Sequence, residues 1–263
     1  MKDVTIERSY NVIKSNDLIR HSRYDLSLVE QKIILRLIQL IKPQDKEFNE
    51  YHLDINEFCS LCGIEQNNGT NILNIKTSLK QLHDKSFWIK IGEEDVLCSW
   101  VAKVKINARS GDVIIKLDDD LKPFLLELKK NFTEYSLFYI LAMKSKYSIR
   151  MYEMLKSYQF KNNITINIDE LKITLLANHY ERFYDFKKNV ITLAINEINM
   201  FTDLIVTYDF KKKGKSVTSV NFKIRYKDMD EQLKMFRSVG NNLAKDENQL
   251  QNIDNNCKSV SFN

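Results

Sequence analysis

One order of secondary-structure elements occurs twice along the chain, and this repetition constrains the fold more than any other feature of the sequence. In the first half, Ser27-Leu28-Val29-Glu30 has the form of a capping box, and apolar residues at helical spacing predict a helix that ends before Pro43. The elements expected next are an extended segment at 52–55, helices at 56–62 and 71–84, and a hairpin of strands at 87–91 and 96–106 turned by residues 92–95.

The second half repeats this order with its own residues. We expect a helix around 149–155, a strand at 164–168, helices at 169–176 and 183–201, and a hairpin of strands at 204–210 and 219–226 turned by the basic loop 211–215. Helix, strand, helix, helix, hairpin is the order of a winged-helix domain. Ile55 aligns with Ile168 at an offset of 113 residues and Leu82 with Ile198 at 116, so the turn between the two helices is three residues longer in the second copy.

The sequence therefore predicts an α+β fold made of two tandem winged-helix domains with a pseudo-two-fold duplication. We assign residues 1–130 to the N-terminal domain, 131–228 to the C-terminal domain and 229–263 to a disordered Asn-rich tail. A chance similarity of two helix-rich segments is the alternative. Between the copies we expect a last strand at 113–117 and a helix from Pro123 to Lys130, capped by the run of aspartates at 118–120.

The positive charge is concentrated in one part of the second copy. The chain has a formal net charge of +5, and residues 182–227 carry ten basic and four acidic side chains while the remainder is almost balanced. Neutralising phosphates releases counterions and drives association, so a basic stretch within a folded unit favours a nucleic acid as partner. A solvated basic face without a partner is the alternative.

The second helix of a helix-turn-helix enters the major groove, where Asn and Gln pair with adenine and Lys or Arg with guanine. In the second copy, five apolar residues fall on one arc of the helix 183–201: Phe186, Val190, Ile191, Ala194 and Ile198. The polar residues predicted to face DNA there, together with the hairpin lysines, are Arg182, Lys187, Lys188, Asn189, Thr192, Asn196, Lys211, Lys212, Lys213 and Lys215. In the first copy the corresponding residues are Asn74, Thr77, Lys80 and Gln81.

Catalytic and metal sites are not expected, and neither is a cofactor. Gly214-Lys215-Ser216 has the ending of a phosphate-binding P-loop, but Asp209 occupies the place of its first glycine. Cys59 and Cys62 have the spacing of metal ligands without a second pair, so we interpret them as buried, reduced thiols. The four histidines are dispersed without a His-x-His pair, which argues against a nickase that uses a tyrosine nucleophile. The chain has no signal peptide or membrane span, and a cytoplasmic location is expected.

Several motifs resemble those of one known family. Asn16-Asp17-Leu18-Ile19, Leu26 to Leu35, Leu121 to Leu125, Tyr147 to Leu155 and Phe186 to Asn199 are similar, in order and spacing, to motifs of the iteron-binding plasmid replication initiators of the tandem winged-helix Rep family. The similarity extends over about residues 12 to 227 and does not include the tail.

The resemblance implies how such a protein works. The C-terminal winged helix would make the main contact with double-stranded, directly repeated origin sequences, called iterons, and the N-terminal one would contribute DNA contacts and dimerisation. Family members act as monomers that open the origin and recruit the host initiator DnaA and the replicative helicase, and as dimers that repress their own gene. A sequence-specific transcriptional repressor is the nearest alternative function, and a DNA nickase is a more distant one.

Overall fold

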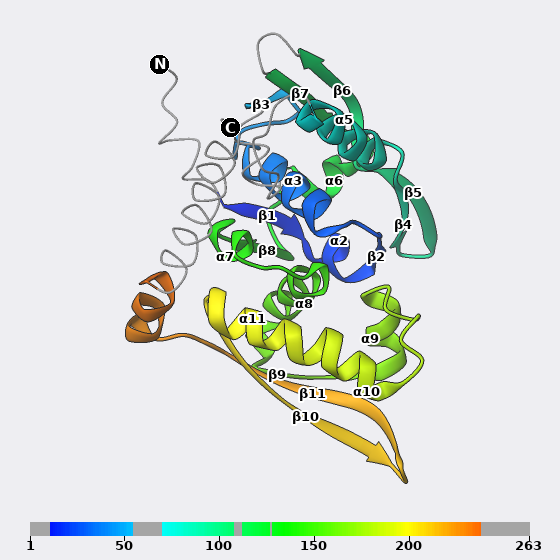
Figure 1. Cartoon of the computed structure of the whole chain (residues 1–263), viewed down its shortest axis with the longest axis vertical. Helices are drawn as coiled ribbons and strands as arrows, with labels where there is room; N and C mark the ends of the chain where they lie inside the picture. Colours follow the sequence, from blue (N-terminus) through cyan, green and yellow to red (C-terminus); the bar gives the residue numbers. More distant parts are fainter. Residues whose placement is uncertain (1–10, 55–69, 108–111, 127, 238–263) are drawn as a thin grey trace, which may run out of the picture.

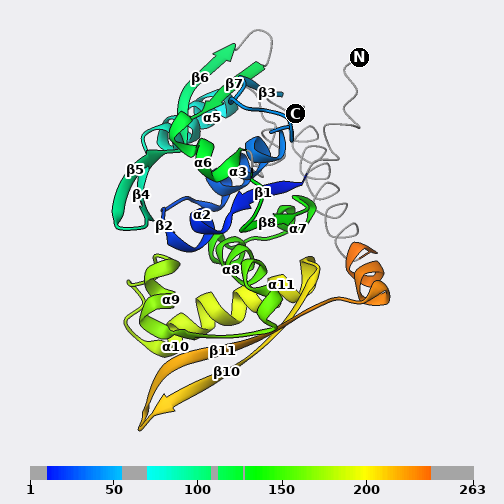
Figure 2. The same ribbon diagram turned by 180° about the vertical axis from the view of Figure 1, so that it is seen from behind.

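The computed structural model describes residues 11–54, 70–107, 112–126 and 128–237. Two modules lie end to end along the long axis of the molecule, and helix α8 (Lys146–Ser157) lies between them (Figures 1 and 2). The fold is two tandem winged-helix domains, as predicted, and both modules end in a β-hairpin that follows a long helix. The predicted helix at 56–62, which contains Cys59 and Cys62, falls outside the described residues.

The N-terminal module is built from helices over three small antiparallel sheets, whose strand orders are β1-β8, β2-β4-β5 and β3-β7-β6. Its elements are β1 (Val12–Ser15), α2 (Asn16–His21), β2 (Ser22–Arg23), α3 (Leu28–Gln39), β3 (Tyr51–Asp54), α5 (Thr70–His83), β4 (Ser86–Ile91), β5 (Glu94–Ser99), β6 (Val101–Asn107), β7 (Asp112–Leu117), η1 (Asp119–Leu121), α6 (Lys122–Leu125), β8 (Phe132–Tyr135) and α7 (Phe138–Leu141). The predicted capping box at α3 is confirmed: the Ser27 hydroxyl accepts a hydrogen bond from the Glu30 amide, and the Glu30 carboxylate accepts one from the Ser27 amide.

The C-terminal module is a single three-stranded sheet, in the order β10-β11-β9, covered by helices. Its elements after α8 are η2 (Gln159–Lys161), β9 (Asn163–Asn167), α9 (Ile168–Thr174), α10 (Phe183–Phe186), the π-helical segment η3 (Lys187–Thr192), α11 (Leu193–Phe201), β10 (Leu204–Lys213) and β11 (Ser216–Tyr226). The long helix expected at 183–201 is thus one continuous helix that contains a π-turn.

Two predictions about the N-terminal module need correction. The single strand expected at 96–106 is two strands in different sheets, because Trp100 turns into the core between β5 and β6 and its ring lies 4.7 Å from that of Phe87. The helix expected from Pro123 to Lys130 ends with α6 at Leu125. The Asp118 carboxylate accepts a hydrogen bond from the Asp120 amide, as expected for a capping residue.

Both hairpins are closed by two-residue turns that begin with glycine. Gly92 follows Ile91 in the β4–β5 hairpin, and Gly214 follows Lys213 in the β10–β11 hairpin. Both glycines have a positive φ, 63° and 62°, which is strained for a residue with a side chain and is required at the first central position of a type II′ turn. Equivalent turns in the two modules agree with the duplication.

The two modules are not separated by a linker. Strand β8 pairs with β1 in the register Val12 to Tyr135, so the chain after residue 131 still contributes a strand to the N-terminal module. The assignment of residues 1–130 and 131–228 to the two domains stays a prediction. The expectation of disorder from residue 229 is wrong for the first part of the tail, since residues 229–237 form a helix in which Met235 is buried. The remaining tail lies outside the described residues.

Helix α8 is buried along its whole length from Tyr147 to Ser157, although it carries charged residues. The Glu153 carboxylate accepts hydrogen bonds from Lys14 Nζ at 2.8 Å and from Tyr135 Oη at 2.6 Å, and Lys14 and Glu153 are each only 1% exposed. Burial raises the pKa of the Tyr135 phenol well above its usual range, so this hydroxyl stays protonated and can donate. This cluster joins α8 to strands β1 and β8.

We expect Glu153→Ala to lower the free energy of unfolding by about 3–5 kcal/mol, because the variant leaves the Lys14 ammonium buried without its partner. Urea denaturation followed by circular dichroism measures this change. Glu134→Ala, at an exposed glutamate on the adjacent strand, is the control and should change stability by less than about 0.5 kcal/mol. A loss below about 1 kcal/mol for Glu153→Ala would contradict this account of the cluster.

Candidate DNA-binding surface

The helix that spans α10, η3 and α11 is the second helix of the helix-turn-helix in the C-terminal module, and we call it the recognition helix (residues 183–201). Three faces can be distinguished by what each contacts. The core face is formed by residues that are fully or almost fully buried: Phe186, Val190, Ile191, Ala194, Ile195 and Ile198. All five positions predicted to form the apolar arc belong to this face, so that prediction is confirmed.

The second face of the recognition helix contacts the β10–β11 hairpin, which is the wing. The rings of Phe183 and Phe210 meet edge to face with centroids 5.1 Å apart, and Lys187 Nζ lies 5.5 Å from the centre of the Phe210 ring. One and a half turns further along the helix, Thr192 Oγ1 lies 3.0 Å from Tyr208 Oη, within hydrogen-bond distance. Aromatic side chains of β10 therefore attach the wing to the start of the recognition helix.

The other end of the recognition helix is held by two polar contacts. The Asn199 side-chain amide donates to the Val206 carbonyl at 2.9 Å and accepts from the Val206 amide at 2.7 Å, which completes the hydrogen bonding of that residue's backbone. Lys227 Nζ donates to the carbonyls of Asn199 and Thr202 at 2.6 Å each, where a cation is favoured at a helix C-terminus. Burial lowers the pKa of Lys227.

The third face is exposed to solvent, and we call it the free face. Its residues are exposed: Tyr184, Lys188, Asn189, Leu193, Asn196 and Met200. Three of the predicted base-contacting residues, Lys188, Asn189 and Asn196, lie on it. Thr192 does not, because its hydroxyl is directed to Tyr208 and the residue is half-buried.

The recognition helix contains its π-turn where it contacts the wing. Lys187 and Thr192, at the two ends of η3, are five residues apart, and both contact aromatic residues of β10. A uniform helical period groups Thr192 with the polar residues of the opposite arc, so the prediction for Thr192 is wrong. Tyr184 and Leu193 are exposed on the free face but are not among the predicted residues, because the prediction considers only polar side chains.

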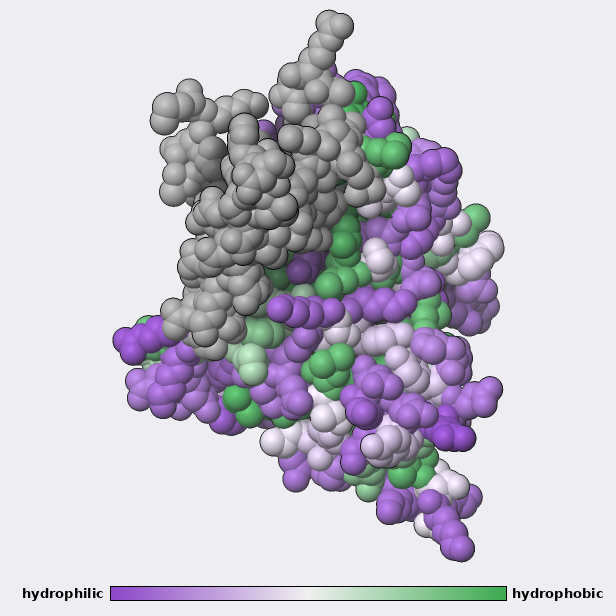
Figure 3. All heavy atoms as spheres, in the orientation of Figure 1, coloured by the Kyte–Doolittle hydropathy of each residue, from purple (hydrophilic) through white to green (hydrophobic). Residues whose placement is uncertain are grey.

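The wing carries the predicted lysines, but they do not all lie in a loop. Lys211, Lys212 and Lys213 belong to β10, which continues to Lys213, and only Lys215 lies in the turn. All four are exposed, and the register shifts between Lys211 and Lys212. A shift of this kind increases the local twist of a hairpin. Hydrophilic side chains cover the tip of the wing (Figure 3).

Arg182 and the wing lysines are close to the start of the recognition helix. Arg182 is exposed and precedes the first residue of α10, where backbone N–H groups attract phosphate. The aromatic contact between Phe183 and Phe210 connects this helix start to the strand residue that precedes Lys211. Lys187 of the helix is thus next to the wing, whereas Lys211 is directed to the opposite face of the sheet, where its Nζ lies 3.4 Å from Thr165 Oγ1 of β9.

In the N-terminal module, the corresponding helix is α5. Thr77, Lys80 and Gln81 are exposed on it, as predicted, while the side chain of Asn74 lies outside the described residues. The Lys80 ammonium is paired with Asp84, and the Thr77 hydroxyl donates to the Leu73 carbonyl at 2.9 Å. The Thr77 hydroxyl thus has a partner within α5, and the Lys80 ammonium has one directly after the end of this helix.

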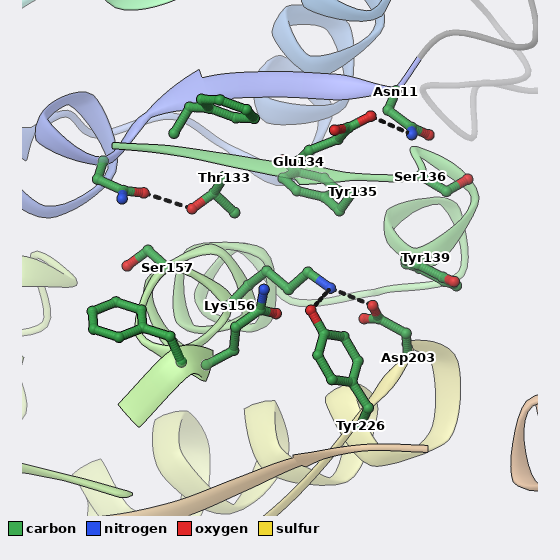
Figure 4. Close-up of a pocket in the computed structure, with 14 residues that line it drawn as sticks. Asn11, Thr133, Glu134, Tyr135, Ser136, Tyr139, Lys156, Ser157, Asp203 and Tyr226 are labelled. Carbon is green, nitrogen blue, oxygen red and sulfur yellow. Dashed lines mark hydrogen bonds and ion pairs between the residues drawn. The ribbon is translucent and has the colours of Figure 1, made fainter. Parts of the chain in front are cut away.

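A polar pocket lies between the modules, lined by residues of β8, the end of α8 and the loop before β10 (Figure 4). Several of its polar groups are bonded to one another: the Lys156 ammonium is paired with Asp203 and lies 3.3 Å from Tyr226 Oη. Asp203 also accepts a hydrogen bond at 2.9 Å from Tyr152 Oη, which does not line the pocket. We interpret the pocket as part of the interface between the modules.

The described residues contain no group of three or more His, Cys, Asp or Glu side chains placed to hold a metal ion. The aspartates at 118–120 instead cap a turn and pair with Lys116 and Lys122. Within the same residues, no helix has both the length and the apolar character needed to cross a bilayer.

Comparison with known proteins gives matches to both modules. Residues 11–156 match the description "Initiator Replication protein, WH1", and residues 167–224 match "Initiator Rep protein, WH2". A replication initiation protein of Escherichia coli is 25% identical over 246 residues, which are 89% of this chain and 74% of the relative. The PI protein of Escherichia coli is 26% identical over 155 residues, which are 52% of this chain and 51% of the relative.

Among solved structures, the fold is similar to that of the Pi initiator protein in complex with iteron DNA. The TM-score is 0.66 at 18% identity, and the similarity covers 84% of this chain and 99% of that chain. The first family match alone includes more than half of the residues, and the resemblance noted from the motifs is confirmed. With both winged-helix domains matched in their order along the chain, the protein belongs to the family of initiator replication proteins.

Proposed function

We propose that the protein initiates plasmid replication by binding directly repeated origin sequences, iterons, in double-stranded DNA. One observation carries this proposal: the contact between Phe183 and Phe210 attaches the wing to the recognition helix, whose free face is exposed, and exposed lysines lie at the end of the wing. The free face would lie in the major groove, and the wing would follow the adjacent phosphates or the minor groove. The Pi initiator, which has a similar fold, was solved with iteron DNA.

The two modules suggest the length of the binding site. Each winged helix would occupy one groove segment, and adjacent segments on one side of the duplex are about 34 Å apart. We therefore infer a site of about two helical turns, with the main contacts from the C-terminal module and additional contacts from α5. Family resemblance supports a monomer as the form that binds repeats, opens the origin and recruits DnaA and the replicative helicase, and a dimer as the form that represses the protein's own promoter.

We also infer that the protein is not an enzyme and acts in the cytoplasm, where plasmid DNA is replicated. The dispersed histidines support the inference that the protein is not an enzyme. A repressor with the same DNA-binding surface is the second candidate function. A stable dimer that binds only a palindrome would favour the repressor, and relaxation of supercoiled DNA in the presence of a divalent metal would favour a nickase.

The direct test is a mobility-shift titration with duplexes from the origin of the plasmid that carries the gene. We expect one monomer to bind each direct repeat, so that a duplex with two repeats gives two successive shifted bands. A duplex of the same composition with scrambled repeats is the control. If the repeats and the scrambled duplex bind equally, the proposal is wrong.

Single substitutions on the free face test base contact. We expect Lys188→Ala and Asn189→Ala each to weaken binding to the repeat by about 1–3 kcal/mol while binding to scrambled DNA changes less, because a contact with a base edge is made only at the correct sequence. Fluorescence anisotropy at fixed salt measures both affinities. Gln81→Ala on α5 is a matched control in the other module, with a smaller effect expected.

Substitution of the wing lysines should have a different signature. Replacing Lys211, Lys212, Lys213 and Lys215 by alanine should weaken binding to the repeat and to scrambled DNA by the same factor, since contacts with phosphates carry no sequence information. The slope of log K against log salt should decrease by about 0.9 for each lysine that contacts a phosphate. An unchanged slope would show that the wing does not lie against the DNA backbone.

A further inference from the structure

An apolar side chain interrupts the polar free face of the recognition helix. Leu193 is 41% exposed and lies between Lys188 and Asn189 on one side and Asn196 on the other. The residues that follow it, Ala194 and Ile195, are buried in the core face. The core positions of this turn are thus occupied by other residues, and Leu193 is directed away from them.

Helical spacing places Leu193 among the polar residues of the free face. Leu193 follows Asn189 by four residues and precedes Asn196 and Met200 by three and seven, which is the spacing of one helix face, and all four residues are exposed. The preceding residue, Thr192, is instead directed to Tyr208 of the wing. A leucine, next to an asparagine, therefore occupies the centre of the surface that would enter the groove.

The side chains of Leu193 and Asn196 match the groups that an A·T base pair presents. In the major groove an A·T pair presents N7 and the N6 amino group of adenine, which a side-chain amide can engage in two hydrogen bonds, and it presents the 5-methyl group of thymine, which only an apolar contact can recognise. Leu193 and Asn196 lie within one helical turn, about 5.4 Å in length, and successive base pairs are about 3.4 Å apart. The two side chains can therefore reach the same or adjacent base pairs.

We propose that Leu193 is a specificity-determining residue that recognises the methyl group of a thymine in the origin repeat, beside an adenine engaged by Asn196. This inference rests on the proposed function. Leu193 contributes shape and apolar contact, whereas Lys188 and Asn189 contribute hydrogen bonds, so a repeat that keeps the same hydrogen-bonding groups but lacks the methyl group is recognised less well.

The test uses 2′-deoxyuridine, which differs from thymidine only by the absence of this methyl group. In duplexes carrying the origin repeat, each thymine is replaced in turn, and the affinity of the full-length protein is measured by fluorescence anisotropy. Loss of one buried methyl group corresponds to about a fourfold weaker affinity. We expect a loss of this size at one or two positions of the repeat, and little change at the other thymines.

The Leu193→Ala variant then identifies the residue responsible. At the sensitive position, the ratio of the affinities for thymine and deoxyuridine should fall from about four to about one. Leu233→Ala is the matched control, because Leu233 is a leucine of similar exposure, 50%, in the helix 229–237 outside the free face and the wing, and this variant should keep the ratio of the unsubstituted protein. The far-ultraviolet circular dichroism of both variants should be unchanged.

The outcomes separate this inference from the function on which it rests. If the protein binds the repeat specifically but no thymine is sensitive, or if the sensitivity persists in Leu193→Ala, the assignment of Leu193 is wrong while the proposed function stands. If the protein does not distinguish the repeat from scrambled DNA, the proposed function fails, and the assignment fails with it.

Discussion

The burial of helix α8 between the two modules is the constraint on which the rest of the structure depends. Three charged residues of this helix are buried, and each is neutralised or hydrogen-bonded by a different part of the chain. The Arg150 guanidinium lies 4.0 Å from the centre of the Tyr24 ring and donates to the Ser22 carbonyl, Glu153 pairs with Lys14, and Lys156 pairs with Asp203. A buried charge that loses its partner is costly, so these contacts hold both modules in one position relative to α8.

This arrangement has a consequence for DNA binding. The recognition helix packs against α8 through its core face, so its free face is fixed by the same core that joins the modules (Figure 1). The aromatic residues of β10 then fix the wing to the recognition helix, and Asn199 and Lys227 hold the opposite end. The recognition helix and the wing are thereby held in a fixed position relative to each other, which reduces the ordering required on binding.

The part of the molecule that departs from regular geometry is the part that would read sequence. The π-turn at η3 inserts one residue into the recognition helix, and such insertions are frequent at functional sites. Thr192, at the end of η3, lies within hydrogen-bond distance of Tyr208, and Leu193 follows it on the free face, one turn before Asn196. In the N-terminal module, Thr77 of α5 bonds to Leu73 of the same helix, and Lys80 pairs with Asp84 directly after it.

Much of the fold and part of the candidate DNA-binding surface could be predicted from the order of the residues. The duplicated elements, the capping box at Ser27, the apolar arc of the recognition helix and the concentration of lysines in the second hairpin all depend on local spacing and composition, and the structure contains each of them. The sequence motifs also identified the family. Local patterns are sufficient here because helix periodicity, caps and glycine turns are determined by neighbouring residues.

Other features depended on contacts between distant segments. The break of one predicted strand at Trp100, the pairing of β8 with β1, the helix at 229–237 and the faces of the recognition helix were decided by packing. The π-turn is the clearest case. Its extra residue is accommodated because the core face packs against α8 while Phe183 and Thr192 contact the wing on either side of it, and no local pattern of residues encodes contacts with both.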